Sequence, residues 1–133
     1  MKNKNIRAIL IDPFAERVSE VTTATGIDSL YNILDCTCIT ITRINFDNGA
    51  SPVDMILDDE GLLKDPNNQR FFKVGLFSQL FAGKALLTCS DKQGDTISVH
   101  KHMTAKNIEK MIHWYTPSRK ELDKSLDWTI IPI

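Results

Sequence analysis

Residues Cys36–Asn45, with the sequence CTCITITRIN, carry the clearest β-strand pattern in the chain. Isoleucines and Arg43 alternate with threonines and cysteines, and β-branched residues in alternation are typical of a strand with two distinct faces. The following Asp47-Asn48-Gly49 favours a tight hairpin turn. We therefore expect Val53–Asp58 to return as the antiparallel partner of this strand.

The same signals, followed outward in both directions, predict an alternation of short strands and short helices. The expected strands are Ile6–Ile11, Arg17–Thr23, Phe71–Val74, Ala85–Ser90, Thr96–Val99 and, at the edge, Trp128–Ile133. The first expected helix is capped by Asp28 or Ser29 and ends at Asp35. The other expected helical segments are Leu76–Phe81, Thr104–Tyr115 and Pro117–Leu126. Since most connections are short, the sheet should be mainly antiparallel. We expect one α+β domain over residues 1–133, with two or three helices on one face of the sheet and a helical C-terminal extension from about residue 103.

The composition restricts the class of protein. Sixteen basic and seventeen acidic side chains give a net charge of −1, which argues against binding to duplex nucleic acid. The longest apolar runs are far shorter than the ~20 residues that span a bilayer, so we expect neither a membrane partner nor a secretion signal, and a cytoplasmic location. Three cysteines in a chain of 133 residues favour reduced thiols.

The most unusual local chemistry follows the acidic segment Asp58-Asp59-Glu60. Between residues 70 and 90 the chain has three cations, no acid and four of its six phenylalanines. We expect Arg70, Lys73 and Lys84 to bind an anion, with Phe71 and Phe77 stacking against a base. The alternative is that the rings belong to the core and the cations lie at its edge.

Other candidate sites have simpler interpretations. The acids at residues 58–60 are expected to form a solvated turn and not a metal site. His100 and His102 would need a third ligand to hold zinc or nickel. Cys36 and Cys38 lack zinc-binding spacing and are expected to be small core residues. The sequence contains no phosphate loop and no nucleophile elbow, so we predict no cofactor, no metal and no catalytic residues.

Several short motifs resemble a family of small proteins from bacteriophages and other mobile elements, which is classified as a domain of unknown function. The motifs are Ile9–Pro13, Asp58-Asp59-Glu60-Gly61-Leu62-Leu63, Phe71-Phe72, Gln79 and Ala82–Leu86, and the similarity spans about residues 6–100. The resemblance implies a phage accessory protein in a bacterial cytoplasm. Small phage proteins of this kind counter host defences by sequestering a nucleotide signal or by binding a defence protein.

The leading hypothesis is therefore a non-enzymatic protein that captures a small nucleotide-type anion at the interface of a homodimer. A second hypothesis is an inhibitor that binds a host protein through its C-terminal helices, with Trp114, Tyr115 and Trp128 as contacts. A third is a metal-dependent nucleotide hydrolase that uses the acids at residues 58–60.

Overall fold

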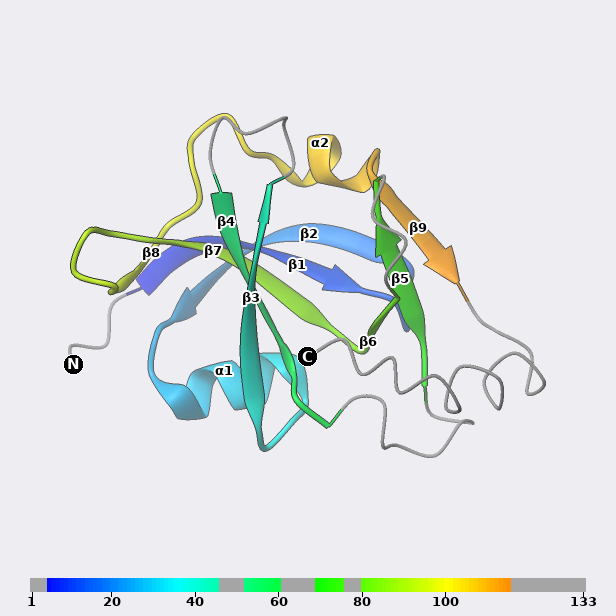
Figure 1. Ribbon diagram of the computed structural model, residues 1–133, viewed down its shortest axis with the longest axis horizontal. Coiled ribbons are helices and arrows are strands. Elements are labelled where there is room, and N and C mark those ends of the chain that lie inside the picture. Colours follow the sequence, from blue (N-terminus) through cyan, green and yellow to red (C-terminus); the bar gives the residue numbers. More distant parts are fainter. Residues whose placement is uncertain (1–4, 46–51, 61–68, 76–79, 116–133) are drawn as a thin grey trace.

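The computed structural model describes residues 5–45, 52–60, 69–75 and 80–115 of the chain. Within these ranges the protein has nine β-strands, which form two antiparallel sheets, and two short helices (Figure 1). The fold is therefore mainly β, with less helix than the α+β plan expected from the sequence. Neither helix in these ranges has the length and apolar character needed to cross a bilayer.

The main sheet has the strand order β2-β1-β7-β4-β3, and β8 pairs with the far end of β7. Its strands are β1 (Asn5–Asp12), β2 (Arg17–Ala24), β3 (Ile39–Asn45), β4 (Pro52–Asp58), β7 (Ala85–Ser90) and β8 (Thr96–Ile97). The predicted hairpins β1–β2, β3–β4 and β7–β8 are confirmed by their antiparallel registers. The insertion of β7 between β1 and β4 joins the hairpins into one sheet, and β7 is buried at five of its six positions.

The second sheet has the order β6-β5-β9 and is built from β5 (Phe71–Val74), β6 (Phe81–Ala82) and β9 (Ile112–Tyr115). It corrects two helix predictions. The helix expected over Thr104–Tyr115 ends at Glu109, and the residues after it pair with β5. Its apolar side chains fit a helical period, but β-branched and aromatic residues in a short run also suit a strand, and the edge of β5 satisfies their backbone groups. Likewise Phe81, expected at the end of a helical turn, is in β6.

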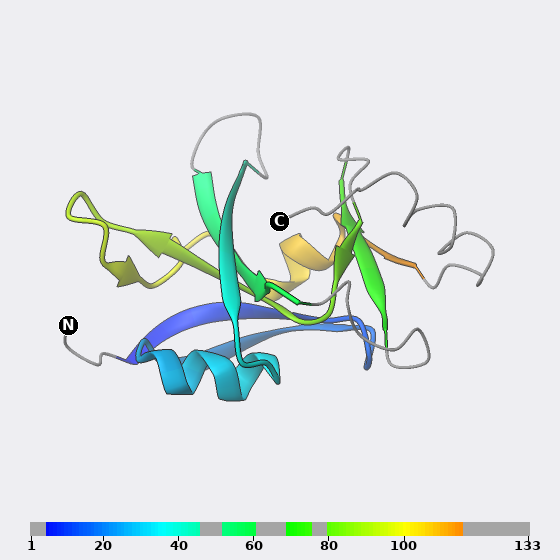
Figure 2. The same cartoon turned by 60° about the horizontal axis from the view of Figure 1, so that its bottom comes forward.

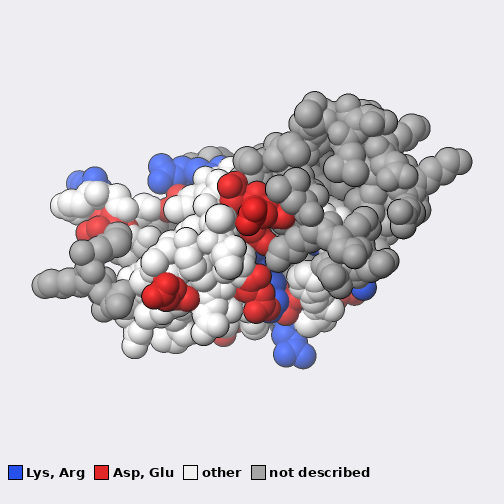
Figure 3. All heavy atoms as spheres, turned by 90° about the horizontal axis from the view of Figure 1, so that it is seen from below, with Lys and Arg blue, Asp and Glu red and all other residues white. Residues whose placement is uncertain are grey.

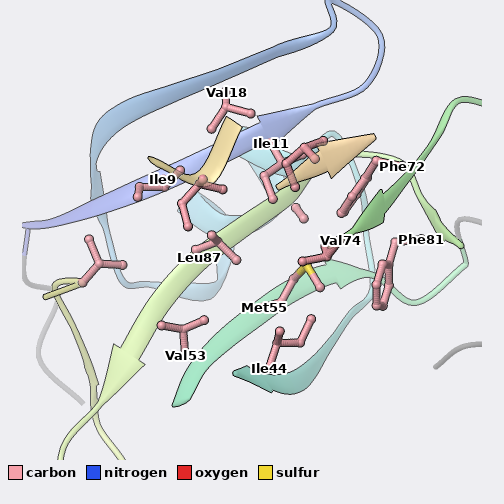
Figure 4. Packing of buried hydrophobic residues seen from close by; sticks show 14 of the residues in the cluster. Ile9, Ile11, Val18, Ile44, Val53, Met55, Phe72, Val74, Phe81 and Leu87 are labelled. Carbon is pink, nitrogen blue, oxygen red and sulfur yellow. The ribbon is translucent and has the colours of Figure 1, made fainter. Parts of the chain in front are cut away.

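The larger core cluster lies between the two sheets. Alternate residues of β1, β4 and β7, such as Ile9, Met55 and Leu87, meet Phe72 and Phe81 from the second sheet (Figure 4). The Phe72 and Phe81 rings stack with centroids 5.5 Å apart. This packing gives Phe72 and Phe81 the role of core residues, as the alternative interpretation of the aromatic segment proposed.

The two helices lie on opposite faces of the main sheet, and not on one face as expected (Figure 2). Helix α1 (Ile27–Leu34) packs Leu30 and Leu34 on the other core cluster, whereas α2 (Ala105–Glu109) contributes Ile108 to the cluster between the sheets. Helix α2 begins as predicted, because Thr104 Oγ1 accepts a hydrogen bond from the Asn107 backbone N–H at 3.2 Å. Both faces of the sheet are covered because β4 and β7 carry apolar side chains on both sides.

Some predictions fall outside the described residues. They are the turn at Asp47-Asn48-Gly49, the ring of Phe77, the motif residues Gly61, Leu62, Leu63 and Gln79, the segment Pro117–Leu126 and the strand Trp128–Ile133. The strand expected from Cys36 begins only at Ile39. Cys36 is half-buried against the α1 cluster, but Cys38 is exposed, so its prediction as a core residue is wrong.

Candidate functional site

Three of the motifs that suggested the family resemblance meet at one end of the main sheet. Strands β1 and β4 both pair antiparallel with β7, so they run parallel to each other and end where β7 begins. At that end Ala85 pairs with Ile11 on one side and with Leu57 on the other. Asp12 follows Ile11 and Asp58 follows Leu57, whereas Lys84 is the residue just before Ala85. The sheet topology thus gathers charged residues that are far apart in the sequence.

Lys84 is the central cation of this region. Its Nζ lies 2.8 Å from Oδ2 of Asp35, and the two side chains are 21% and 76% exposed. Asp35 follows the last residue of α1 and has a left-handed backbone, with φ of 52°. Gly83, the residue before Lys84, has φ of +84°, a conformation in which a side chain would be strained. A half-buried lysine side chain is therefore held by a carboxylate that is open to solvent.

The backbone of Arg70 lies next to Gly83, the residue before Lys84. The Gly83 backbone N–H donates to the Arg70 carbonyl oxygen at 2.9 Å, which joins the start of β5 to the residue before Lys84. The Arg70 guanidinium donates to the Gln69 carbonyl oxygen at 2.7 Å, and Gln69 itself is buried. The structure thus brings the backbones of Arg70 and Lys84, two of the three residues predicted to bind an anion, close together.

Lys73 and Phe71 lie elsewhere, on the face of the second sheet that points away from the core. The register pairs Lys73 with His113 and Phe71 with Tyr115, and residues paired in this way share a face. The Lys73 ammonium lies 5.2 Å from the centre of the Tyr115 ring, as a cation–π contact. The ring of Phe71 is only 2% exposed, so it is not open to stack on a base. Tyr115 is the half-buried aromatic ring beside this lysine.

Asp59 and Glu60 form an exposed turn, as the simpler interpretation of the acidic segment expected, but Asp58 is the last residue of β4 and is buried, so its prediction as a solvated residue is wrong. Asp58 is 4% exposed, and its Oδ1 accepts a hydrogen bond from the Glu60 N–H at 2.9 Å. The Asp59 N–H extends the β3–β4 ladder by donating to the Cys38 carbonyl oxygen at 3.0 Å. Asp59 and Glu60 are exposed. Among the described residues, no three His, Cys, Asp or Glu side chains are placed to hold a metal ion. The rings of His100 and His102 stack on each other at 5.5 Å.

The surface on the α1 side of the molecule is more acidic than basic. Viewed from below, its described part shows several patches of Asp and Glu with little Lys or Arg between them (Figure 3). A large polyanion would be repelled by such a surface. A small ligand that contacts only one or two cations is not subject to the same penalty.

Two polar clusters were not anticipated from the sequence. Arg7 in β1 donates to the carbonyl oxygens of His100 and Met103 and to Glu20. The buried carboxylate of Asp54 binds Arg43 and Ser90. The sequence offered one signal for these clusters. Arg7 lies within the apolar run Ile6–Ile11 and Asp54 within Val53–Asp58, and a charged group in a buried strand needs a partner.

Comparison with known proteins places the chain in a family. The model of the domain of unknown function DUF3846 matches residues 6–113. The chain belongs to this family. The match extends beyond the region of about 6–100 expected from the motifs, and it ends at residue 113, within β9 of the second sheet. No curated protein and no solved structure gives a significant match.

Proposed function

We propose that this DUF3846 protein is a non-enzymatic binding protein that captures a small anionic ligand of the nucleotide type. The observation that carries the proposal is the hydrogen bond from the Gly83 N–H to the Arg70 carbonyl oxygen, which places the backbones of Arg70 and Lys84 close together where the family motifs meet. Two adjacent cations at a partly buried position can neutralise one phosphate group.

The surrounding acids favour a nucleotide over a simple phosphate. Exposed carboxylates accept hydrogen bonds from ribose hydroxyls and from amino groups of a base. Asp59 and Glu60 follow the end of β4, the strand that lies next to the start of β7. A ligand with a phosphate for the cations and hydroxyl donors for the acids would satisfy both kinds of group.

The Asp35 carboxylate is paired with the Lys84 ammonium. An incoming phosphate has to replace this carboxylate, and the exposure of Asp35 makes that exchange possible without unfolding α1. Asp35 therefore acts as an internal competitor that lowers the affinity for the anion.

The proposed setting is a phage accessory protein that acts in the cytoplasm of a bacterial host and removes a defence signal. This setting rests on the resemblance to proteins of mobile elements. A homodimer is the proposed assembly, because two-fold symmetric dimers are the commonest oligomers of soluble proteins.

Isothermal titration calorimetry against cyclic dinucleotides, ADP-ribose and inorganic phosphate tests the proposal. At least one nucleotide should bind more tightly than phosphate. Lys84→Ala and Arg70→Ala should each weaken binding by about 2–5 kcal/mol, as for other desolvated charge pairs. Asp35→Asn should strengthen it, because the variant frees the ammonium. The matched control is Lys106→Ala on the exposed side of α2.

The sign of the Asp35→Asn effect separates a binding site from a structural ion pair. If the pair only stabilises the fold, Asp35→Asn will lower the melting temperature and will not increase the affinity for any ligand of the panel. Silence of the wild-type protein across the whole panel would rule out the proposed function.

A further inference from the structure

The outer edge of the main sheet at β3 has a different character from the rest of the surface. Within the described part of the chain, β3 is hydrogen-bonded on one side only, to β4. In a strand, about half of the backbone N–H and C=O groups point to each side, so β3 directs polar groups outward. Such an edge can accept another strand.

Two side chains on one face of β3 are unusually exposed. Ile41 is 56% exposed and is one of three large apolar residues in the described ranges with about half or more of their surface in water. Arg43, two residues further, has a side chain that is 63% exposed. Because strand residues two apart point the same way, these groups stand side by side along the edge.

The Arg43 side chain is fixed by a contact with Asp54 of β4. Its Nε donates to Oδ1 of Asp54 at 3.1 Å, and the Asp54 side chain is 9% exposed. Oδ2 of the same carboxylate accepts a hydrogen bond from the Ser90 hydroxyl. The contact with Asp54 uses Nε, and the two terminal nitrogens of a guanidinium can bind the two oxygens of a further carboxylate. The arginine is thus positioned before any partner binds, which lowers the entropy that binding costs.

The charge of the edge indicates which partner fits it. The strand Ile39–Asn45 contains Arg43 and no acid, so a second copy of β3 would bring no opposite charge to it. A partner strand with Asp or Glu opposite Arg43 and an apolar residue opposite Ile41 would complement both groups. Because the two positions are two residues apart, the acid and the apolar residue must also be two apart in the partner.

We propose that the edge of β3 binds an extended, acidic segment of a partner protein, which adds to the main sheet as a further strand. Backbone hydrogen bonds along β3 would supply affinity, and Ile41 and Arg43 would select the sequence. This surface lies on the opposite side of β4 from β7 and its Lys84 end, so it is independent of the proposed nucleotide site.

Selection of a random dodecapeptide library on the immobilised protein tests the inference. Enriched peptides should carry Asp or Glu two residues from an aliphatic or aromatic residue. Titration of a labelled enriched peptide should show that Arg43→Ala and Ile41→Asp each weaken binding about ten-fold or more, the range typical of central interface residues. Arg43→Lys should restore only part of the affinity, because lysine does not offer two parallel donors.

Three controls make the outcome decisive. Lys92→Ala in the exposed β7–β8 turn and Lys84→Ala at the other site should leave peptide binding unchanged. Ile41→Asp keeps the test valid if loss of Arg43 unfolds the protein, because Ile41 contributes little to the core. The inference is wrong if enriched peptides lack a carboxylate or bind Arg43→Ala and Ile41→Asp equally well. A concentration-dependent dimer that Ile41→Asp abolishes in analytical ultracentrifugation would also overturn it, since a second copy would then occupy the edge.

Discussion

Replacement of Arg7 by alanine should destabilise the protein more than any other removal of a half-exposed charge. The Arg7 guanidinium bonds the carbonyl oxygens of His100 at 3.1 Å and Met103 at 2.5 Å. Its backbone also accepts from Val99 and donates to Ser98. These contacts hold the segment before α2 against β1, and each joins residues more than 90 positions apart in the sequence.

The size of the effect follows from the two carbonyl contacts. A hydrogen bond from a charged donor contributes about 1.5–3 kcal/mol when it is shielded from water. The Arg7 side chain is 32% exposed, so we take the lower part of that range for each bond. The expected loss for Arg7→Ala is about 2–4 kcal/mol, which for a chain of this size lowers the melting temperature by roughly 8–16 °C. Arg7→Lys should recover less than half, because it lacks the fork that spans two carbonyls.

The salt bridge to Glu20 adds a dependence on pH. The hydrogen bond from Arg7 lowers the pKa of Glu20 below its ordinary value of 4.5. A carboxyl whose pKa is lower in the folded state stabilises the fold above the unfolded value, and that contribution disappears as the pH falls through the folded value. The wild-type melting temperature should therefore decline below pH 4.5, and Arg7→Ala and Glu20→Gln should each remove the same part of the decline.

Differential scanning calorimetry from pH 3 to pH 7 would measure both effects, with Arg17→Ala at the exposed start of β2 as the matched control. A surface substitution of that kind should change stability by no more than about 0.5 kcal/mol. If Arg7→Ala and Arg17→Ala melt within 2 °C of each other at pH 7, the contacts of Arg7 do not hold the segment before α2, and the reasoning is refuted.

Two further predictions concern buried side chains. Thr88 Oγ1 is buried and makes no hydrogen bond to any residue that the structure describes, so Thr88→Val should raise stability by about 1 kcal/mol in chemical denaturation, and a loss of similar size would contradict the assignment. Burial raises the pKa of the Cys89 thiol, whereas Cys38 is exposed. Because the thiolate is the reactive form, iodoacetamide at pH 8 should modify Cys38 within minutes and Cys89 only in denaturant, and mass-spectrometric peptide mapping that finds Cys89 modified first would contradict the packing.

The sequence alone determined the local units of this protein. Alternation in Ile39–Asn45 and Val53–Asp58 predicted the β3–β4 hairpin, and the apolar run ending at Asp12-Pro13 predicted β1 and its return in β2. Helix α1 was predicted with its correct end at Asp35, but it begins after Gly26 and not after the expected cap at Asp28 or Ser29. These elements depend on contacts between neighbours in the chain, and such contacts leave a regular period in the residue pattern.

Only the tertiary structure decided how the units combine. The run Ile112–Tyr115 suits a helix or a strand equally well, and the free edge of β5 made it a strand. The tertiary structure paired Lys84 with Asp35 and the Gly83 backbone with that of Arg70, whereas Lys73 lies against Tyr115. These outcomes depend on pairing between distant strands, where one edge competes with another for the same backbone groups. No local pattern records that competition, so the candidate site could be predicted in its residue types but not in its arrangement.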